Sequence, residues 1–308
     1  MSTKTKFHLS GVVVSLDTPF RASGEIDFDA LGRLLEMHLA EGAAGFLTPA
    51  QAAEVNVLTL DERIELIRFV QEALRGRAPL IAGATAPDEN ESFRTAEAAL
   101  AAGCEIVLVE IPSNRRADRN ATLEFVRSFA STGMPVLMLQ DLDWNGAGLE
   151  ISWIVELFET VDAFRCLKVE VSPAGPKYSA VLQATGGRLH VSGGWAADQM
   201  IEALDRGVDV FIPTAMTRLY RAVIEAHAAG DRALARRIFH QILPVLAFTR
   251  QHLDISIQFY KRLFYRRGIF STIRVRKECR PYDRHHESYG NELIDYLEKV
   301  EEEHRRFS

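Results

Sequence analysis

Residues 164–171 read Phe164-Arg165-Cys166-Leu167-Lys168-Val169-Glu170-Val171, a strand-like run that includes a lysine and, two residues later, a glutamate. The run has the length and composition of a buried β-strand. Because side chains alternate across a strand, Lys168 and Glu170 are predicted to point the same way. Removal of water lowers the pKa of a lysine amine, and the neutral amine can attack a carbonyl carbon. An exposed lysine with a surface counter-ion produces the same pattern, so both interpretations stay open here.

Similar short apolar runs recur on either side of this segment, and helical periodicity follows them. The predicted strands are residues 11–15, 44–48, 79–83, 105–109, 135–139, 164–171, 189–192 and 208–212. The helices predicted between them are residues 28–40, 60–75, 91–102, 120–131, 151–161, 179–185 and 196–205. Eight such alternations favour an α/β fold of the closed (β/α)8 type, the TIM barrel, because a doubly wound sheet more often stops at about five to seven strands.

After residue 215 the pattern becomes helical only. Helices are predicted at residues 219–229, from about 231 to 267, and at 292–303. Their apolar positions need a partner surface, so residues 216–308 are predicted to form a C-terminal helical extension packed on a barrel of residues 1–215. The basic run 274–280 lacks interleaved aromatic residues, and we interpret it as a solvated loop.

Bulk composition narrows the class of protein. Of the 308 residues, 47% are apolar and 25% are charged, which is typical of a soluble globular chain. A net charge of −6 does not favour nucleic acid or an anionic membrane as partner. No run has membrane-spanning length, and no signal-peptide core is present. Cys104, Cys166 and Cys279 lack metal-ligand spacing, so we expect reduced thiols in a cytoplasmic protein without a metal.

Several landmarks around these strands resemble the family of dihydrodipicolinate synthase and N-acetylneuraminate lyase. Their order and spacing match the family from about Gly11 to the C-terminal helices, and Lys168 falls on its Schiff-base lysine. The landmarks are Thr18-Pro19-Phe20, Gly42-x-x-Gly45, Glu54, Ile81-Ala82-Gly83, Ala102-Gly103, Pro112 and Ser192-Gly193.

The resemblance implies a lyase of the class I type, in which Lys168 forms an imine with a 2-oxo acid such as pyruvate or a sugar-derived keto acid. No cofactor is expected, the partner is a small carbonyl compound, and family members commonly form homodimers or homotetramers. Substrate contacts are predicted near the strand ends at Thr18, Gln51, Ala52, Asp141, Trp144, Ser192, Gly193 and Ile212.

The same comparison shows departures from the family pattern. Ala50-Gln51-Ala52-Ala53-Glu54 stands in place of Gly-Thr-Thr-Gly-Glu, and Trp144 stands in place of a basic residue. Leu139 aligns with the tyrosine that relays protons, and positioned proton transfer is typically worth about 10² to 10⁴-fold in rate. We therefore predict Glu170 as the acid–base partner, with water or Asp141; a structural counter-ion role for Glu170 is the open alternative.

The substitutions also favour a larger or more apolar carbonyl substrate than aspartate semialdehyde. Trp195 is a further candidate for the mouth of the pocket, whereas Glu54 is expected at a helix terminus or an interface. Two rival functions stay open. The first is a barrel that has lost catalysis and acts as a binding or regulatory protein. The second is an enzyme that uses the acids of the pocket without an imine.

Overall fold

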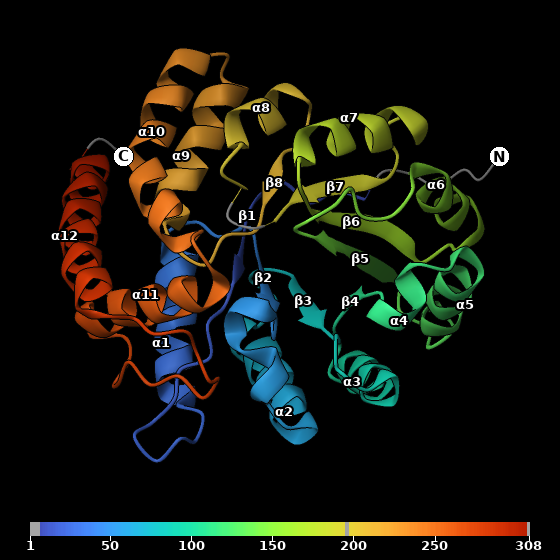
Figure 1. Cartoon of the computed structure of the whole chain (residues 1–308), viewed down its shortest axis with the longest axis horizontal. Helices are drawn as coiled ribbons and strands as arrows, with labels where there is room; N and C mark the ends of the chain where they lie inside the picture. The colour runs from blue at the N-terminus through green and yellow to red at the C-terminus, as the bar shows by residue number, and fades with distance from the viewer. Residues whose placement is uncertain (1–6, 195–196, 307–308) are drawn as a thin grey trace.

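Eight parallel strands close into a barrel in the order β1 to β8, with β8 pairing back onto β1 (Figure 1). The computed structural model describes residues 7–194 and 197–306. The prediction of a (β/α)8 barrel with a C-terminal helical extension is confirmed. The strands are β1 (Gly11–Ser15), β2 (Gly45–Thr48), β3 (Leu80–Gly83), β4 (Ile106–Glu110), β5 (Val136–Asp143), β6 (Phe164–Val171), β7 (His190–Gly193) and β8 (Val210–Phe211).

Helices surround this barrel and continue beyond it. Short polar side chains begin several of them; Asp27, for example, accepts a hydrogen bond from the backbone N–H of Ala30 at 3.1 Å. The helices are α1 (Phe28–Ala40), α2 (Leu60–Leu74), α3 (Glu89–Ala101), α4 (Ser113–Arg116), α5 (Arg119–Ala130), α6 (Ile151–Thr160), α7 (Ala174–Ala184), α8 (Met200–Asp205), α9 (Thr217–Ala228), α10 (Arg232–Thr249), α11 (Leu253–Arg266) and α12 (Arg284–Arg306), with the 3₁₀ turns η1 (Gln51–Ala53) and η2 (Val55–Val57).

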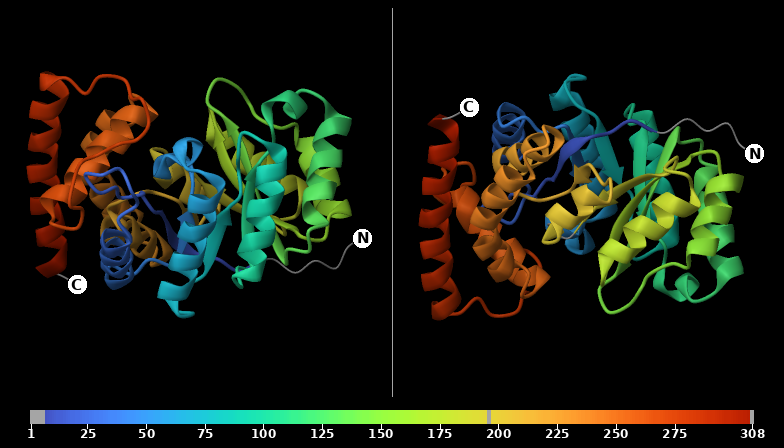
Figure 2. Two further views of the ribbon diagram at one scale, coloured as in Figure 1. Left: turned by 90° about the horizontal axis from the view of Figure 1, so that it is seen from below. Right: turned by 90° about the horizontal axis from the view of Figure 1, so that it is seen from above.

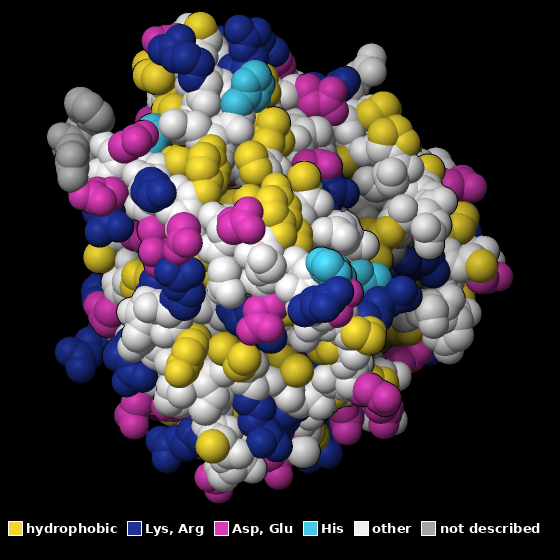
Figure 3. Space-filling model, turned by 60° about the vertical axis from the view of Figure 1, so that its left-hand side comes forward, with side chains coloured by type: hydrophobic (Ala, Val, Ile, Leu, Met, Phe, Trp, Pro, Cys, Tyr) yellow, Lys and Arg dark blue, Asp and Glu magenta, His cyan; other side chains and the backbone are white. Residues whose placement is uncertain are grey.

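The C-terminal helices lie along one side of the barrel. Both views in Figure 2 place α12 at one edge of the molecule, opposite α5 and α6. Acidic and basic side chains are interspersed over the face that α12 helps to form (Figure 3). Helix α9 packs against β1 and occupies the place of the eighth barrel helix, while the division of the chain near residue 216 stays a prediction. In the described part of the chain, no helix has both the length and the apolar character needed to cross a membrane.

The largest differences from the predicted helix bounds lie in three places. The helix expected at residues 231–267 is two helices, because the chain leaves α10 after Thr249 and the His252 ring starts α11 by accepting from Asp254 N at 3.1 Å. Helix α7 begins at Ala174, since glycine and proline in its first turn are tolerated there. Helix α12 begins at Arg284, in a polar stretch without a clear apolar period.

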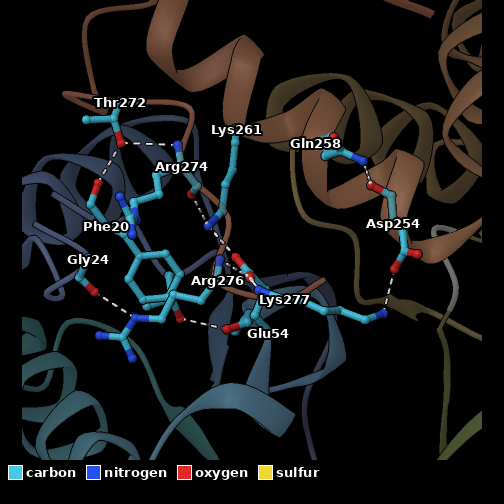
Figure 4. Close-up of polar contacts among 12 residues, drawn as sticks. Phe20, Gly24, Glu54, Asp254, Gln258, Lys261, Thr272, Arg274, Arg276 and Lys277 are labelled. Atoms are coloured by element: carbon cyan, nitrogen blue, oxygen red, sulfur yellow. Dashed lines mark hydrogen bonds and ion pairs between the residues drawn. The ribbon is translucent and has the colours of Figure 1, made fainter. Parts of the chain in front are cut away.

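A buried cluster fastens the extension to the barrel, and we call Phe20, Glu54, Lys261, Arg276 and Lys277 the Glu54 cluster (Figure 4). Lys261 of α11 is 1% exposed and forms an ion pair with Glu54, which lies between η1 and η2. The other carboxylate oxygen of Glu54 accepts from the backbone N–H groups of Arg276 and Lys277, both at 2.8 Å. Glu54 is therefore a buried anchor between distant segments.

The Phe20 ring lies between two cations of this cluster. Lys261 Nζ is 4.3 Å from the ring centroid and Arg276 Cζ is 4.4 Å from it. Arg276 also forms hydrogen bonds to both carboxylate oxygens of Glu62, at 2.7 and 2.8 Å. The prediction that the basic run 274–280 is a solvated loop was wrong at these positions, because Arg276 and Lys277 are half-buried and hold the run against the barrel.

Candidate active site

Lys168 lies near the carboxyl end of β6, and its side chain points into the barrel. It stands opposite Gln140 of β5 and Ser192 of β7 in the strand register. Lys168 is 5% exposed, and its Nζ lies 3.3 Å from Oε1 of Glu170. The two side chains thus share one face, as strand alternation predicts, and they form a buried ion pair.

Glu170 is held in place from two sides. Gln140 Nε2 donates a hydrogen bond to Oε2 of Glu170. Gly194, just after β7, lies so close that a Cβ atom at this position would overlap the Glu170 carboxyl group. A larger residue at position 194 would therefore displace the carboxylate from Lys168.

The side chain that faces Lys168 from β5 is Gln140, and the placement of Leu139 there was wrong. Leu139 is packed in the layer between the barrel and its helices. The pairing of β5 with β6 shifts register between Leu137 and Met138, which counting along the sequence cannot detect. An amide can orient Glu170 by hydrogen bonding, but it does not supply the proton that a tyrosine would.

Asp141 does not reach the cavity, so the prediction that it contacts substrate or assists Glu170 was wrong. It is buried, its Oδ2 lies 3.1 Å from Lys177 Nζ, and its Oδ1 accepts from Leu149 N at 2.9 Å. Burial raises the pKa of Asp141, although the Lys177 charge opposes this shift. Because Asp141 follows Gln140 directly, alternation turns it away from Lys168, and it instead fixes the loop after β5.

A cavity of about 60 Å³ opens beside Lys168 and Glu170. This exceeds the roughly 10–15 Å³ that one water needs on the same measure. Four of the predicted substrate contacts line it, namely Gln51, Ala52, Trp144 and Ile212.

Three other predicted contacts are absent from the described lining of this cavity. Thr18 Oγ1 donates to the Ala53 carbonyl at 2.9 Å and so supports the η1 turn. Ser192 is buried in the barrel beside Lys168. A Cβ atom on Gly193 would lie 3.1 Å from both the Phe211 ring and the Tyr178 hydroxyl, so this glycine serves close packing. Trp195 lies outside the described residues.

The C-terminal extension supplies cavity residues that the sequence did not indicate. Thr249 and Arg250, where α10 ends, line it together with Ser256 and Tyr260 of α11. A second chamber of about 440 Å³ adjoins the first and shares Trp144, Glu170, Arg250 and Leu253 with it. Arg250 forms an ion pair with Asp198, and burial lowers the pKa of its guanidinium. The site therefore combines barrel residues with two helices from the far end of the chain.

Within residues 7–194 and 197–306, no group of three His, Cys, Asp or Glu side chains could hold a metal ion. The residues described above are an amine, a carboxylate, a guanidinium and several hydroxyls around a partly apolar space. This set can bind a small anionic carbonyl compound and move protons around it.

Known proteins share both the sequence pattern and the fold. The profile of the dihydrodipicolinate synthetase family matches residues 8–298. The chain is 26% identical over 243 residues to 4-hydroxy-tetrahydrodipicolinate synthase of Pseudomonas aeruginosa, covering 77% of this chain and 82% of that protein. It is 35% identical over 129 residues to the Chelativorans sp. enzyme of the same name, a match that spans 42% of this chain and 44% of that relative.

Two solved structures superpose over almost the whole fold. A putative dihydrodipicolinate synthetase from Pseudomonas aeruginosa has a TM-score of 0.86 at 22% identity, covering 94% of this chain and 100% of that one. The prophage protein YagE of E. coli K12, in complex with pyruvate, has a TM-score of 0.83 at 18% identity, covering 95% and 98%. On the profile match, this chain belongs to the dihydrodipicolinate synthetase family.

Proposed function

We propose that the protein is a Schiff-base lyase that forms an imine between Lys168 and a 2-oxo acid such as pyruvate or a sugar-derived keto acid. The observation that carries the proposal is a buried lysine amine that lines a cavity and lies 3.3 Å from a carboxylate. Membership of a family whose named relatives are synthases supports the lyase class. We also propose that the protein forms a homodimer or a homotetramer.

Glu170 has a defined part in the proposed chemistry. It takes a proton from the Lys168 ammonium, and the neutral amine then forms a C–N bond as the carbonyl electrons move to oxygen. The resulting carbinolamine loses water to give a protonated imine. This imine draws electrons from a neighbouring C–C or C–O bond, which is the bond that the lyase breaks.

Arg250 supports an anionic substrate. Arg250 lines both chambers, and a guanidinium carries five N–H donors, so it can hold Asp198 and a carboxylate together. Sequence comparison had suggested a site without a basic side chain, because Trp144 stands where relatives carry one. Arg250 brings a positive charge to the same cavity from the break between α10 and α11.

Borohydride trapping tests the proposal. We expect pyruvate or a longer 2-oxo acid, followed by borohydride, to add one reduced adduct to the intact protein, and peptide mass spectrometry to map it to Lys168. Absence of an adduct across a broad panel of 2-oxo acids would contradict the proposal and would favour a binding or regulatory protein.

Arg250→Gln is expected to weaken binding of 2-oxo acids by roughly 10- to 100-fold, because a charge-assisted hydrogen bond is worth about 1.5–3 kcal/mol. The concentration of pyruvate that gives half-maximal trapping should rise accordingly. Trapping of acetone, which has no carboxylate, should change little and serves as the control. An equal loss for both compounds would show that Arg250 does not bind the carboxylate.

A further inference from the structure

The proposed imine chemistry, on which this inference rests, needs a proton donor when the carbinolamine loses its hydroxyl group. Strand β5 does not provide one, because Gln140 faces Lys168 and Leu139 faces the helices. We infer that Tyr260 of α11 is the catalytic acid that protonates this hydroxyl. The C-terminal extension thereby supplies the phenol that the fifth strand lacks.

The orientation of α11 places Tyr260 at the cavity. Leu253, Ser256 and Tyr260 all line it, and their spacing of three and four residues is that of a single helix face. The next residue, Lys261, projects about 100° further around the helix and is fixed by Glu54. The buried ion pair thus sets the rotation of α11 that turns Tyr260 toward the cavity.

Tyr260 and the reacting amine line the same cavity. Tyr260 is 3% exposed, and it lines the same cavity of about 60 Å³ as Lys168 and Glu170. A small molecule bonded to Lys168 Nζ would extend into the cavity that Tyr260 lines. Thr249, at the end of α10, also lines the cavity and forms a hydrogen bond with the Tyr260 side chain.

The surroundings keep the phenol protonated. Burial raises the pKa of Tyr260 to about 12, although a hydrogen bond with Thr249 opposes this shift. At neutral pH the group therefore carries the proton that the step requires. A phenol in this state can donate its proton to a departing hydroxide.

The step begins from the neutral carbinolamine. The phenolic proton of Tyr260 moves to the hydroxyl oxygen, the C–O bond breaks and water leaves. The nitrogen lone pair of Lys168 forms the C=N bond. Glu170 still carries the proton that it took from the ammonium, and it returns this proton to the phenolate through the released water. The products are the protonated imine, one water, the phenol and the carboxylate.

Tyr260→Phe tests this assignment. We expect the rate of imine formation with pyruvate, followed by rapid quenching with borohydride, to fall by about 10² to 10⁴-fold. The amount trapped after long incubation and the half-maximal pyruvate concentration should change little, because the amine and Arg250 remain. Tyr296→Phe is the control, since Tyr296 of α12 is partly buried and donates to the Gln241 carbonyl at 2.9 Å but is not a lining residue of the cavity.

The outcomes separate this inference from the proposed function. If the unmodified protein forms no adduct, the imine chemistry itself fails. If it forms the adduct and Tyr260→Phe reacts at the same rate, the assignment of Tyr260 is overturned. Should Tyr260→Phe fail to fold, fluorotyrosine at position 260 replaces it. We then expect the basic limb of the pH–rate profile to move to lower pH, and an unmoved limb would contradict the inference.

Discussion

Lys168→Arg is expected to abolish the borohydride adduct and to reduce turnover of 2-oxo acids by about 10⁴-fold or more, while the protein still folds. A guanidinium keeps a positive charge beside Glu170, so the buried carboxylate retains a partner. The guanidinium remains protonated and cannot act as a nucleophile. Intact-protein mass spectrometry after reduction and a steady-state assay measure the two effects, and thermal unfolding checks the fold.

Lys177→Arg is the control for this variant. Lys177 is another buried lysine, but it pairs with Asp141 and donates to the Ala147 carbonyl at 2.8 Å instead of lining the cavity. Its substitution should leave trapping intact. Turnover that survives in Lys168→Ala would point instead to an enzyme that uses the acids of the pocket without an imine.

Lys261→Met is expected to lower the free energy of unfolding by about 3–5 kcal/mol, the usual cost of removing one partner from a buried ion pair. Glu54 would keep its two backbone N–H donors but would lose its cation, and Phe20 would lose one of the charges against its ring. Urea unfolding followed by circular dichroism measures the change. We also expect slower imine formation, because α11 carries Tyr260.

The exposed pair Glu36–Arg77 provides the comparison. Its N–O distance is 2.5 Å, yet both side chains are more than a third exposed, so Arg77→Met should lower the free energy of unfolding far less than Lys261→Met does. Adding Glu54→Leu to Lys261→Met should recover part of the loss, because no buried carboxylate is then left alone. A cost for Lys261→Met as small as that for Arg77→Met would contradict the anchoring role of Glu54.

The barrel was predictable because its signals are local. Each strand is a short apolar run, each early helix has its own polar start, and alternation alone put Lys168 and Glu170 on one face. The eight predicted strands all exist, and β6 has the predicted bounds. Such local patterns can be recognised without knowledge of the rest of the chain.

The remaining parts of the site depend on register and on distant contacts. A shift of one residue in β5 exchanges Leu139 for Gln140 and turns Asp141 outward, since the side-chain period of a strand is two. Lys261 and Glu54 are 207 residues apart, and no local pattern links them. Arg250 and Tyr260 could have been suspected only from the interruption of the long helix near His252, where a capping side chain precedes an acidic residue.

Arg250 lies at the break between α10 and α11, so we expect binding of a ligand in the cavity to stabilise the C-terminal helices. A molecule bonded to Lys168 and held by Arg250 would bridge the sixth strand and the last third of the chain. Binding to the folded arrangement stabilises it by an amount that grows with the logarithm of the ligand concentration once this exceeds the dissociation constant. Saturation with a 2-oxo acid should therefore slow proteolytic cleavage in the segment from α11 to α12, even though that segment lies outside the barrel.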